Sequence, residues 1–464
     1  MPAHAPSPPP SEGDVNHGAR RTSWAAAHVG AEARALLGRD EAVFLRQSLS
    51  TPCLSAIRRA EGIWIEDADG RRYMDFHGNS VHHLGHGHPR VRRAIAAQLE
   101  ALSFAPRRFT CEPAIALAER LLRLAPPGLK DGKVLFAPGG SEAIEIAIKL
   151  ARVATGRFKT LSFWDAFHGA GFGASSVGGE ALFRGNRIGP LLSGAEHVPP
   201  FACFRCPFGF PQASGNPDIG RCRMACAQAM TFTLGREGDF AAVVAEPVRA
   251  VPYLPPPGFW PEVASACQKS GTLLVFDEIP TGLGKTGRLF ACEHAGVSPD
   301  ILVLGKALGG GVLPLAAVVA RRELDVAADL ALGHYTHEKN PVLAAAALAA
   351  LDVIEDEGLA ERAALLGAHA LARLGDIAQS RPCIGEVRGL GLLIGVELID
   401  ADGAPAPDLA ERVLYAALSR GLSLKTTMGS VLTLSPPLII GRHDLDRALD
   451  ILAESIDAAA GQGE

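Results

Sequence analysis

Short, almost uninterrupted runs of apolar residues alternate with amphipathic stretches between about residue 90 and residue 320. Such short apolar runs are typical of buried strands, and between them apolar residues recur at helical spacing, as in residues 141–150. The predicted strands cover residues 133–137, 160–163, 241–245, 273–276 and 301–304. Buried strands separated by helices indicate a mostly parallel sheet with helices on both faces.

The two ends of the chain carry a different pattern. Residues 22–48 have helical periodicity, and two strand-like stretches, 62–67 and 72–76, flank an Asp-rich turn that predicts a strand pair. From about residue 350 the pattern changes to a helix, a strand pair near residues 387–398, and further helices. We therefore predict an α/β protein whose smaller α+β domain is built from both chain ends.

The patterns predict four segments. They are a disordered Pro-rich leader (1–21), the first part of the small domain (22–85), a large domain with a mostly parallel sheet (86–345), and the C-terminal part of the small domain (346–464).

Composition narrows the classes of protein. With 48% hydrophobic and 20% charged residues, the 464-residue chain is globular. A formal net charge of −5 without basic runs argues against nucleic acid as a partner. The sequence has no run of about 18 uncharged apolar residues, which argues against a membrane-spanning helix. The leader has no apolar signal-peptide core, so we expect a cytoplasmic protein.

Three motifs place reactive groups at the ends of predicted strands. Residues 137–143 read Ala-Pro-Gly-Gly-Ser-Glu-Ala, and the free N–H groups of such a helix start attract phosphate, although a simple N-cap has the same pattern. Asp277 follows a second strand, and Lys306 follows a third. A lysine there becomes nucleophilic when desolvation lowers its pKa. Together the motifs indicate a pyridoxal phosphate site with a phosphate anchor, a carboxylate for the pyridine nitrogen and a lysine for the covalent bond.

In this order the motifs resemble those of the class III, fold-type I pyridoxal-phosphate-dependent aminotransferases, over roughly residues 45–460. The resemblance implies a homodimer with its active site at the subunit interface. It rests on residues 85–89 (Gly-His-Gly-His-Pro), 140–143 (Gly-Ser-Glu-Ala), 167–169 (Phe-His-Gly), 246–247 (Glu-Pro), 277–278 (Asp-Glu), Lys306 and 389–392 (Gly-Leu-Gly-Leu).

The resemblance also implies which residues meet pyridoxal 5'-phosphate. Lys306 bonds to the cofactor and moves the proton, and Asp277 pairs with the pyridinium nitrogen through a hydrogen bond worth roughly 1.5–3 kcal/mol. Thr336 matches the position that reaches the phosphate of the neighbouring subunit. The remaining cofactor contacts are Gly140 and Ser141 at the phosphate, Phe167 and Ile279 on the two faces of the ring, and His168 and Glu246.

Three departures from the transaminase pattern surround the expected site. Pro280 replaces a usual Gln, residues 336–341 carry charges where two glycines are usual, and loop 75–84 is shorter and holds three histidines. These features are most similar to the subgroup of (R)-1-hydroxy-2-aminoethylphosphonate ammonia-lyases, which release ammonia and phosphonoacetaldehyde.

For such a small aminophosphonate, the resemblance implies that Arg388 binds the acid group, because a guanidinium binds carboxylate or phosphonate through two parallel hydrogen bonds. Ser80 and His82 of the short loop are expected near the substrate. Arg249, Arg107 and Arg108 are further candidate phosphonate ligands.

Two other functions stay open. One is an ω-amino-acid or amine transaminase that uses pyruvate or 2-oxoglutarate. The other is a cofactor-binding regulator without turnover, which would need a DNA-binding module; the sequence shows no such extension, and intact Lys306 and Asp277 argue against it.

Four cysteines form two close pairs, Cys203 with Cys206 and Cys222 with Cys226. This spacing is similar to that of a structural zinc site, which needs four soft ligands. An iron–sulfur cluster is a second interpretation, and free thiols are a third.

Overall fold

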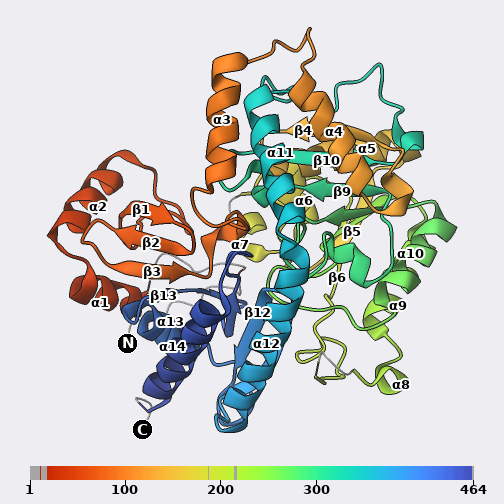
Figure 1. Ribbon diagram of the computed structural model, residues 1–464. Coiled ribbons are helices and arrows are strands. Elements are labelled where there is room, and N and C mark those ends of the chain that lie inside the picture. The colour runs from red at the N-terminus through yellow and green to blue at the C-terminus, as the bar shows by residue number, and fades with distance from the viewer. Residues whose placement is uncertain (1–10, 12–17, 186–187, 214–216, 462–464) are drawn as a thin grey trace.

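The computed structural model describes residues 11, 18–185, 188–213 and 217–461, and its centre is a seven-stranded sheet (Figure 1). Six strands are parallel to one another, and β10 alone runs antiparallel, between β4 and β9. In spatial order the strands are β4 (Lys133–Ala137), β10 (Ala316–Ala320), β9 (Ile301–Leu304), β8 (Leu273–Asp277), β7 (Phe240–Ala245), β5 (Lys159–Phe163) and β6 (Ala195–Val198).

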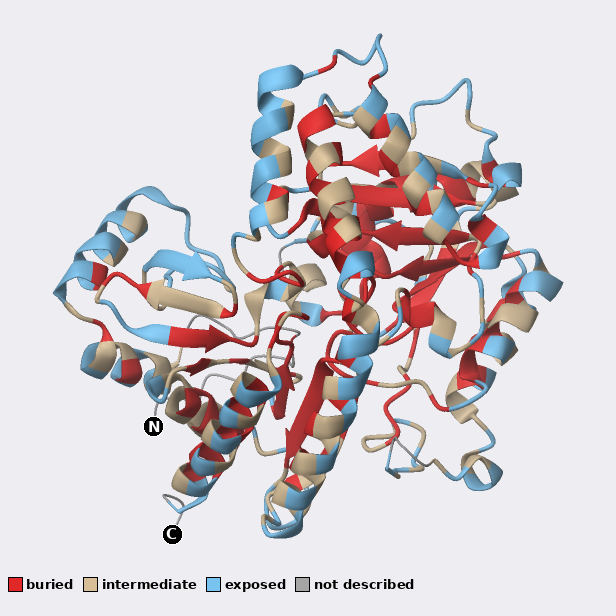
Figure 2. Ribbon diagram, in the orientation of Figure 1, coloured by how far each residue is buried: buried red, intermediate tan, exposed pale blue. Residues whose placement is uncertain are grey.

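Both faces of this sheet are buried, as Figure 2 shows. Alternate residues of a strand point to opposite faces, and in β8 Val275 joins one hydrophobic cluster while Phe276 joins the other. Helix α5 (Gly140–Thr155) covers one face by packing on β4, β7, β8, β9 and β10. On the other face, α10 (Phe259–Ser270) packs on β8 and α4 (Glu112–Leu124) on β4. The predicted covered parallel sheet is therefore confirmed.

The two chain ends meet in a small sheet of order β1-β2-β3-β13. Its strands are β1 (Ile57–Glu61), β2 (Trp64–Asp67), β3 (Arg72–Asp75) and β13 (Leu422–Ser423). Strand β13 runs parallel to β3, with Leu422 opposite Met74, so C-terminal residues complete an N-terminal sheet. The predicted origin of the small domain in both chain ends is confirmed, whereas the boundaries at residues 85 and 345 stay a prediction.

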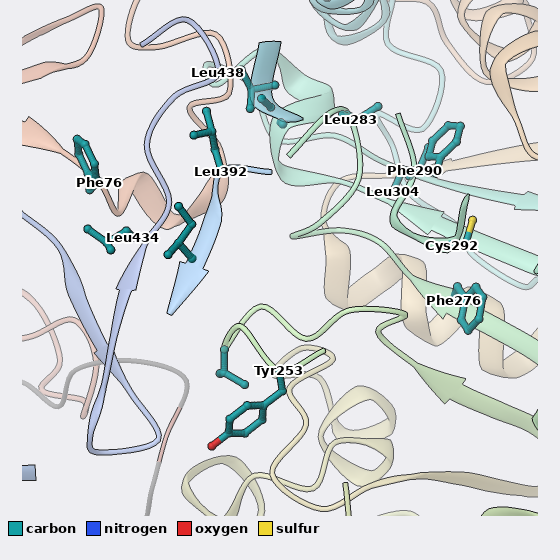
Figure 3. Close-up of a cluster of buried hydrophobic side chains, with 14 of the residues drawn as sticks. Phe76, Tyr253, Phe276, Leu283, Phe290, Cys292, Leu304, Leu392, Leu434 and Leu438 are labelled. Carbon is teal, nitrogen blue, oxygen red and sulfur yellow. The ribbon is translucent and has the colours of Figure 1, made fainter. Parts of the chain in front are cut away.

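A third sheet belongs to the C-terminal part, in the order β11-β12-β15-β14. Its strands are β11 (Ile384–Leu390), β12 (Leu393–Leu398), β15 (Val431–Leu434) and β14 (Lys425–Thr427). One hydrophobic cluster joins this sheet to the central one: Figure 3 shows Leu434 and Leu392 with Leu304 and Phe276. The small and large parts are therefore packed against each other through apolar side chains.

The other helices of eight or more residues lie around these sheets. They are α1 (Ala19–His28), α2 (Ala31–Val43), α3 (Pro89–Ala101), α9 (Ala225–Glu237), α11 (Pro341–Asp356), α12 (Leu359–Gln379), α13 (Pro407–Ser419) and α14 (Arg442–Ala460). Shorter helices are α6 (Phe172–Val177), α7 (Ala181–Arg184) and α8 (Ile219–Cys222).

The predicted leader, residues 1–21, lies mostly outside the described residues. Its last residues, from Ala19 onward, already form α1, so the leader ends earlier than predicted. Across the described ranges, the structure contains no helix that is both long and apolar enough to cross a membrane.

Candidate active site

The carboxyl ends of five strands bring the predicted cofactor residues to one edge of the central sheet. In an open sheet, parallel strands present their carboxyl ends to a common crevice. The segments directly after the strands carry Gly140 and Ser141 (after β4), Phe167 and His168 (after β5), Glu246 (after β7), Asp277 (the end of β8) and Lys306 (after β9).

Asp277 is buried and is oriented by its neighbours. Its Oδ2 lies 2.8 Å from Nδ1 of His168, and its Oδ1 accepts a hydrogen bond from the backbone N–H of Ile279 at 3.0 Å. Because a carboxylate only accepts, the proton of this pair sits on Nδ1 of His168, which leaves Nε2 to accept from the Ser162 hydroxyl at 3.3 Å. Both oxygens of Asp277 therefore have hydrogen-bond partners that hold its side chain in place, as a partner for a pyridine nitrogen needs.

The sequence prediction missed Ser162. It is the polar residue of the otherwise apolar run Leu161–Phe163 in β5, and that interruption was the available signal. Its hydroxyl meets the ring nitrogen of His168 that does not contact Asp277, so Ser162 acts on Asp277 only through the histidine.

Close packing joins the glycine motifs into one cradle. A Cβ added to Gly140 would lie 2.8 Å from Cδ1 of Ile279, and one added to Gly169 would lie 2.5 Å from Oγ of Ser141. The Ser141 hydroxyl accepts from the backbone N–H of Ala170 at 3.1 Å. The first turn of α5 follows Gly139, an N-cap residue without a side chain. The free N–H groups of this turn therefore face the crevice side of the sheet, where they can bind an anion.

Lys306 lies on the wall of a cavity of about 460 Å³, together with Phe167. Its backbone has φ of +46°, a left-handed conformation that costs a residue with a Cβ about 1–3 kcal/mol and that is concentrated at functional sites. Phe167 contacts Phe183, with ring centroids 4.5 Å apart.

These groups fit pyridoxal phosphate. A glycine-lined helix start suits the phosphate, a buried carboxyl group suits the ring nitrogen, and an amine on a cavity wall suits the covalent bond. Ile279, whose side chain packs against both Gly140 and Gly305, lies between the anchor and the lysine.

Two further predicted cofactor residues are Glu246 and Thr336. Glu246 is buried, and its Oε1 accepts from the backbone N–H of Ala250 at 3.3 Å. Thr336 is exposed and is not on the wall of the cavity that holds Lys306. An exposed position is what a residue that reaches a neighbouring subunit needs.

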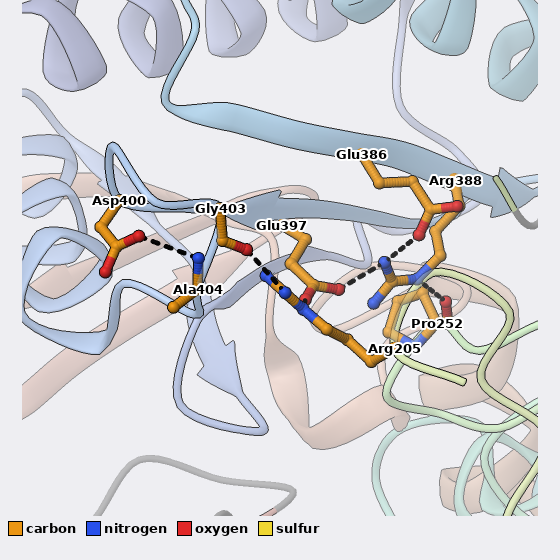
Figure 4. Close-up of polar contacts among 8 residues, drawn as sticks. All are labelled: Arg205, Pro252, Glu386, Arg388, Glu397, Asp400, Gly403 and Ala404. Carbon is orange, nitrogen blue, oxygen red and sulfur yellow. Dashed lines mark hydrogen bonds and ion pairs between the residues drawn. The ribbon is translucent and has the colours of Figure 1, made fainter. Parts of the chain in front are cut away.

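Arg388 lies in a buried ion-pair network instead of on the cavity (Figure 4). Its Nη1 donates to Glu397 at 2.7 Å and to Glu386, and its Nε donates to the carbonyl of Pro252 at 2.6 Å. Glu397 also accepts from Arg205 at 2.7 Å. Two carboxylates thus balance two guanidinium groups, and Arg388 has no net positive charge to offer a substrate.

The other candidate arginines are also directed elsewhere. Arg249 is buried, donates to the carbonyl of Asp165 and lies over the ring of Tyr253. Arg107 is exposed and contacts His334, and Arg108 is exposed. In this single chain, none of the three lines the cavity beside Lys306.

Of the two loop residues expected near the substrate, only Ser80 lines the cavity. His82 is 1% exposed, and its Nε2 lies 3.0 Å from the carbonyl of Asp75. Burial lowers the pKa of His82 to about 4, so the ring is neutral at neutral pH and serves to hold the loop.

Among the described residues, the four paired cysteines are not grouped as metal ligands. All four are free, and across the described ranges no three His, Cys, Asp or Glu side chains are grouped so that they could hold a metal ion. Burial raises the pKa of Cys203 to about 11 and that of Cys226 to about 12, so both are thiols at neutral pH when no metal is bound. The expected zinc or iron–sulfur site is therefore not supported, and the free-thiol alternative describes these residues.

Comparison with known proteins gives a consistent picture of the fold. The family model described as "Aminotransferase class-III" matches residues 46–456. The chain is 43% identical over 456 residues to the (R)-1-hydroxy-2-aminoethylphosphonate ammonia-lyase of Vibrio splendidus (strain 12B01), covering 96% of this chain and 95% of the relative. It is 36% identical over 432 residues to the leucine/methionine racemase of Thermococcus litoralis, covering 91% and 95%.

Among solved structures, an aminotransferase of Bacillus anthracis superposes with a TM-score of 0.84 at 29% identity, covering 92% of this chain and 98% of that one. The predicted α/β fold is therefore confirmed by whole-chain likeness as well as by its sheet. The three relatives are named for three different reactions, so the fold alone leaves the reaction open.

Proposed function

Because the chain belongs to the class-III aminotransferase family, we propose that it is a pyridoxal-phosphate-dependent lyase that converts (R)-1-hydroxy-2-aminoethylphosphonate to phosphonoacetaldehyde and ammonia. The observation that carries the proposal is the 43% identity, over 96% of this chain, to an enzyme named for that reaction. The cationic cavity beside Lys306 adds support, because the substrate is an anion.

We assign the cofactor contacts to the residues at the sheet edge. Gly140 and Ser141 would hold the phosphate, Asp277 the ring nitrogen, and Lys306 the carbonyl carbon, with His168 and Ser162 orienting Asp277. When bound, the cofactor supplies an electron sink for the carbon that carries the substrate's amine.

The reaction needs one base and a leaving hydroxyl. The Lys306 amine takes a proton from the amine-bearing carbon and returns it to the hydroxyl, which leaves the neighbouring carbon as water. The freed enamine becomes an imine, which adds water and separates into the aldehyde and ammonia. No oxidant or amino acceptor is consumed, and one water is lost and one regained.

A transaminase that uses pyruvate or 2-oxoglutarate is the second candidate, and the likeness to a Bacillus anthracis aminotransferase favours it. A transaminase keeps the substrate's amino group on the enzyme until a keto acid removes it. A lyase releases the amino group with each turnover.

The experiment mixes the purified holoenzyme with the aminophosphonate in the absence of any keto acid and then separates the cofactor by chromatography. We expect pyridoxal phosphate to be recovered unchanged. Stoichiometric pyridoxamine phosphate, reversed by pyruvate or 2-oxoglutarate, would identify a transaminase and overturn the lyase proposal. Exchange of the carbon-bound hydrogen with solvent, without ammonia or pyridoxamine phosphate, would place the enzyme with the racemases and would overturn it too.

We also propose that the enzyme is a homodimer with its active site at the interface. Large apolar side chains are exposed around the segment that precedes α4, including Leu99 (53%) and Phe109 (63%). Phe104 of this segment contacts His337, next to Thr336, with ring centroids 5.3 Å apart. Exposed apolar side chains beside an expected intersubunit residue support a subunit contact there.

A further inference from the structure

The cavity beside Lys306 has a wall that the cofactor residues do not use. Besides Phe167 and Lys306, the residues that line the cavity include those of this wall: Lys425 of β14, His77 and Ser80 of the loop after β3, and Arg21 of α1. Gly140 and Ser141, the phosphate anchor, are not part of it. The cofactor's phosphate is therefore expected to bind away from this wall.

The wall is positively charged. Arg21, Lys306 and Lys425 line the cavity, and none of the described residues that line it is Asp or Glu. Burial, and next the charge of Lys425, lower the pKa of His77 to about 4, and the charge of Lys306 acts in the same direction. His77 therefore lies within electrostatic reach of both lysines and remains a neutral hydrogen-bonding group at neutral pH.

The loop that carries His77 and Ser80 is held in an unusual conformation. Gly78, Asn79 and Ser80 have positive φ values of 43°, 46° and 59°. The Asp75 carboxylate maintains this turn, since its Oδ1 accepts from the backbone N–H groups of His77 at 3.0 Å and Gly78 at 2.9 Å. Two successive non-glycine residues in the left-handed region are costly and persist where a site needs them.

Lys425 is fixed by a sheet. Strand β14 pairs with β15, with Lys425 opposite Thr433, and the Thr427 and Thr433 hydroxyls are 2.8 Å apart in the buried interior. A site on a strand holds its charge in a defined position.

We propose that Lys425, with His77 and Ser80, forms the subsite that binds the tetrahedral dianion of the substrate while its amine lies at Lys306. This inference rests on the proposed function and names the residues that select a phosphonate. A lysine supplies a compact charge with three donors, and a phosphonate offers three oxygens, so one cation and neighbouring neutral donors can share it. Arg21 contributes charge at the rim, where one of its Nη groups donates to the carbonyl of Pro52 at 3.0 Å.

The test compares Lys425→Met and Lys425→Gln with Lys425→Arg in the holoenzyme. The matched control is Lys269→Met, which removes the same charge from an exposed position on α10. KM and kcat are measured with the aminophosphonate. Binding of ethylphosphonate, which has no amine to react, is measured by calorimetry, and melting temperatures confirm that the variants fold.

We expect Lys425→Met and Lys425→Gln to raise KM and weaken ethylphosphonate binding about 10- to 100-fold, the loss typical of a charge-assisted contact. The value of kcat should change much less, because Lys306 and Asp277 are untouched. Lys425→Arg should keep most of the affinity, and Lys269→Met all of it. A KM and an ethylphosphonate affinity within twofold of wild type in both neutral variants, or no ethylphosphonate binding to the wild type, would overturn the subsite.

The two proposals fail in different ways. If the wild type forms pyridoxamine phosphate but ethylphosphonate binding depends on Lys425, the subsite stands and the lyase reaction falls. If turnover proceeds without an acceptor and replacing Lys425 changes neither KM nor ethylphosphonate binding, the lyase proposal holds and the subsite proposal is refuted.

Discussion

Gly140 illustrates how one missing methyl group shapes the site. A Cβ there would lie 2.8 Å from Cδ1 of Ile279, the side chain placed between the phosphate anchor and Lys306. Gly140→Ala should therefore push Ile279 toward the ring position and weaken cofactor binding by about 1–3 kcal/mol. Titration of the apoenzyme with pyridoxal phosphate measures this loss.

Adding Ile279→Val removes the atom that the new methyl group meets, so the double variant should regain part of the affinity. Gly38→Ala is the control, because a Cβ at Gly38 of α2 meets no atom within 4 Å. Equal affinities for Gly140→Ala and wild type would contradict the proposed cradle.

Single residues also show which features of the site the sequence alone can predict and which it cannot. The location of Lys306, Asp277 and the Gly-Ser pair at one edge of the sheet could be predicted because strand ends and glycine motifs are visible in the sequence. The placement of Arg388 could not, because its enclosure by Glu397 and Pro252 depends on how three separate segments pack. The cysteine spacing could not predict a metal site either, because spacing along the chain does not determine how side chains group in space.

Among the elements, the loop after β3 carries the buried His82, which should make the stability of the protein depend on pH. Burial lowers the pKa of His82 to about 4, below its ordinary 6.5. The stability that this ring contributes is therefore present above about pH 6.5 and is lost as the pH falls toward 4, by about 1–2 kcal/mol at pH 5. His82→Gln keeps a side-chain N–H for the carbonyl of Asp75 but does not titrate.

Thermal unfolding between pH 7 and pH 5 should therefore show a smaller loss of stability for His82→Gln than for the wild type. His443→Gln, at an exposed position of α14, is the matched control and should follow the wild type. Parallel melting curves for His82→Gln and wild type would show that His82 does not titrate as its burial requires.

The strands themselves were predicted unevenly. β4 and β9 match their predicted bounds, and β5, β7 and β8 extend one residue beyond theirs. β10 was missed because Ala-Ala-Val-Val-Ala has weak strand propensity; its position between β4 and β9 comes from pairing with both. Tertiary pairing, which a local pattern does not contain, decided this element.

For the whole molecule, the proposed homodimer makes a prediction about shared sites. Lys306→Ala removes the base from a chain, and Thr336→Ala removes a phosphate contact that we assign to its neighbour. In a mixed dimer, the Lys306 of one chain faces the intact Thr336 of the other, so one complete site forms. Light scattering after chromatography should give twice the 48.6 kDa chain mass.

Mixing and refolding the two variants should then restore up to about a quarter of wild-type activity, since half of the dimers are mixed and each has one complete site. Lys306→Ala mixed with wild type gives the control for dilution. A monomer in solution, or mixtures no more active than the sum of their parts, would contradict an interface site.

The central claim is that one site releases ammonia at every turnover without an amino acceptor. The most direct measurement is the amount of ammonia and phosphonoacetaldehyde formed per active site from (R)-1-hydroxy-2-aminoethylphosphonate, in a solution cleared of keto acids. The account predicts many equivalents of both products in a one-to-one ratio, and none from the Lys306→Ala variant. A yield that stops at one equivalent of aldehyde without free ammonia, and that rises only when added pyruvate or 2-oxoglutarate takes up the amino group as an amino acid, would contradict it.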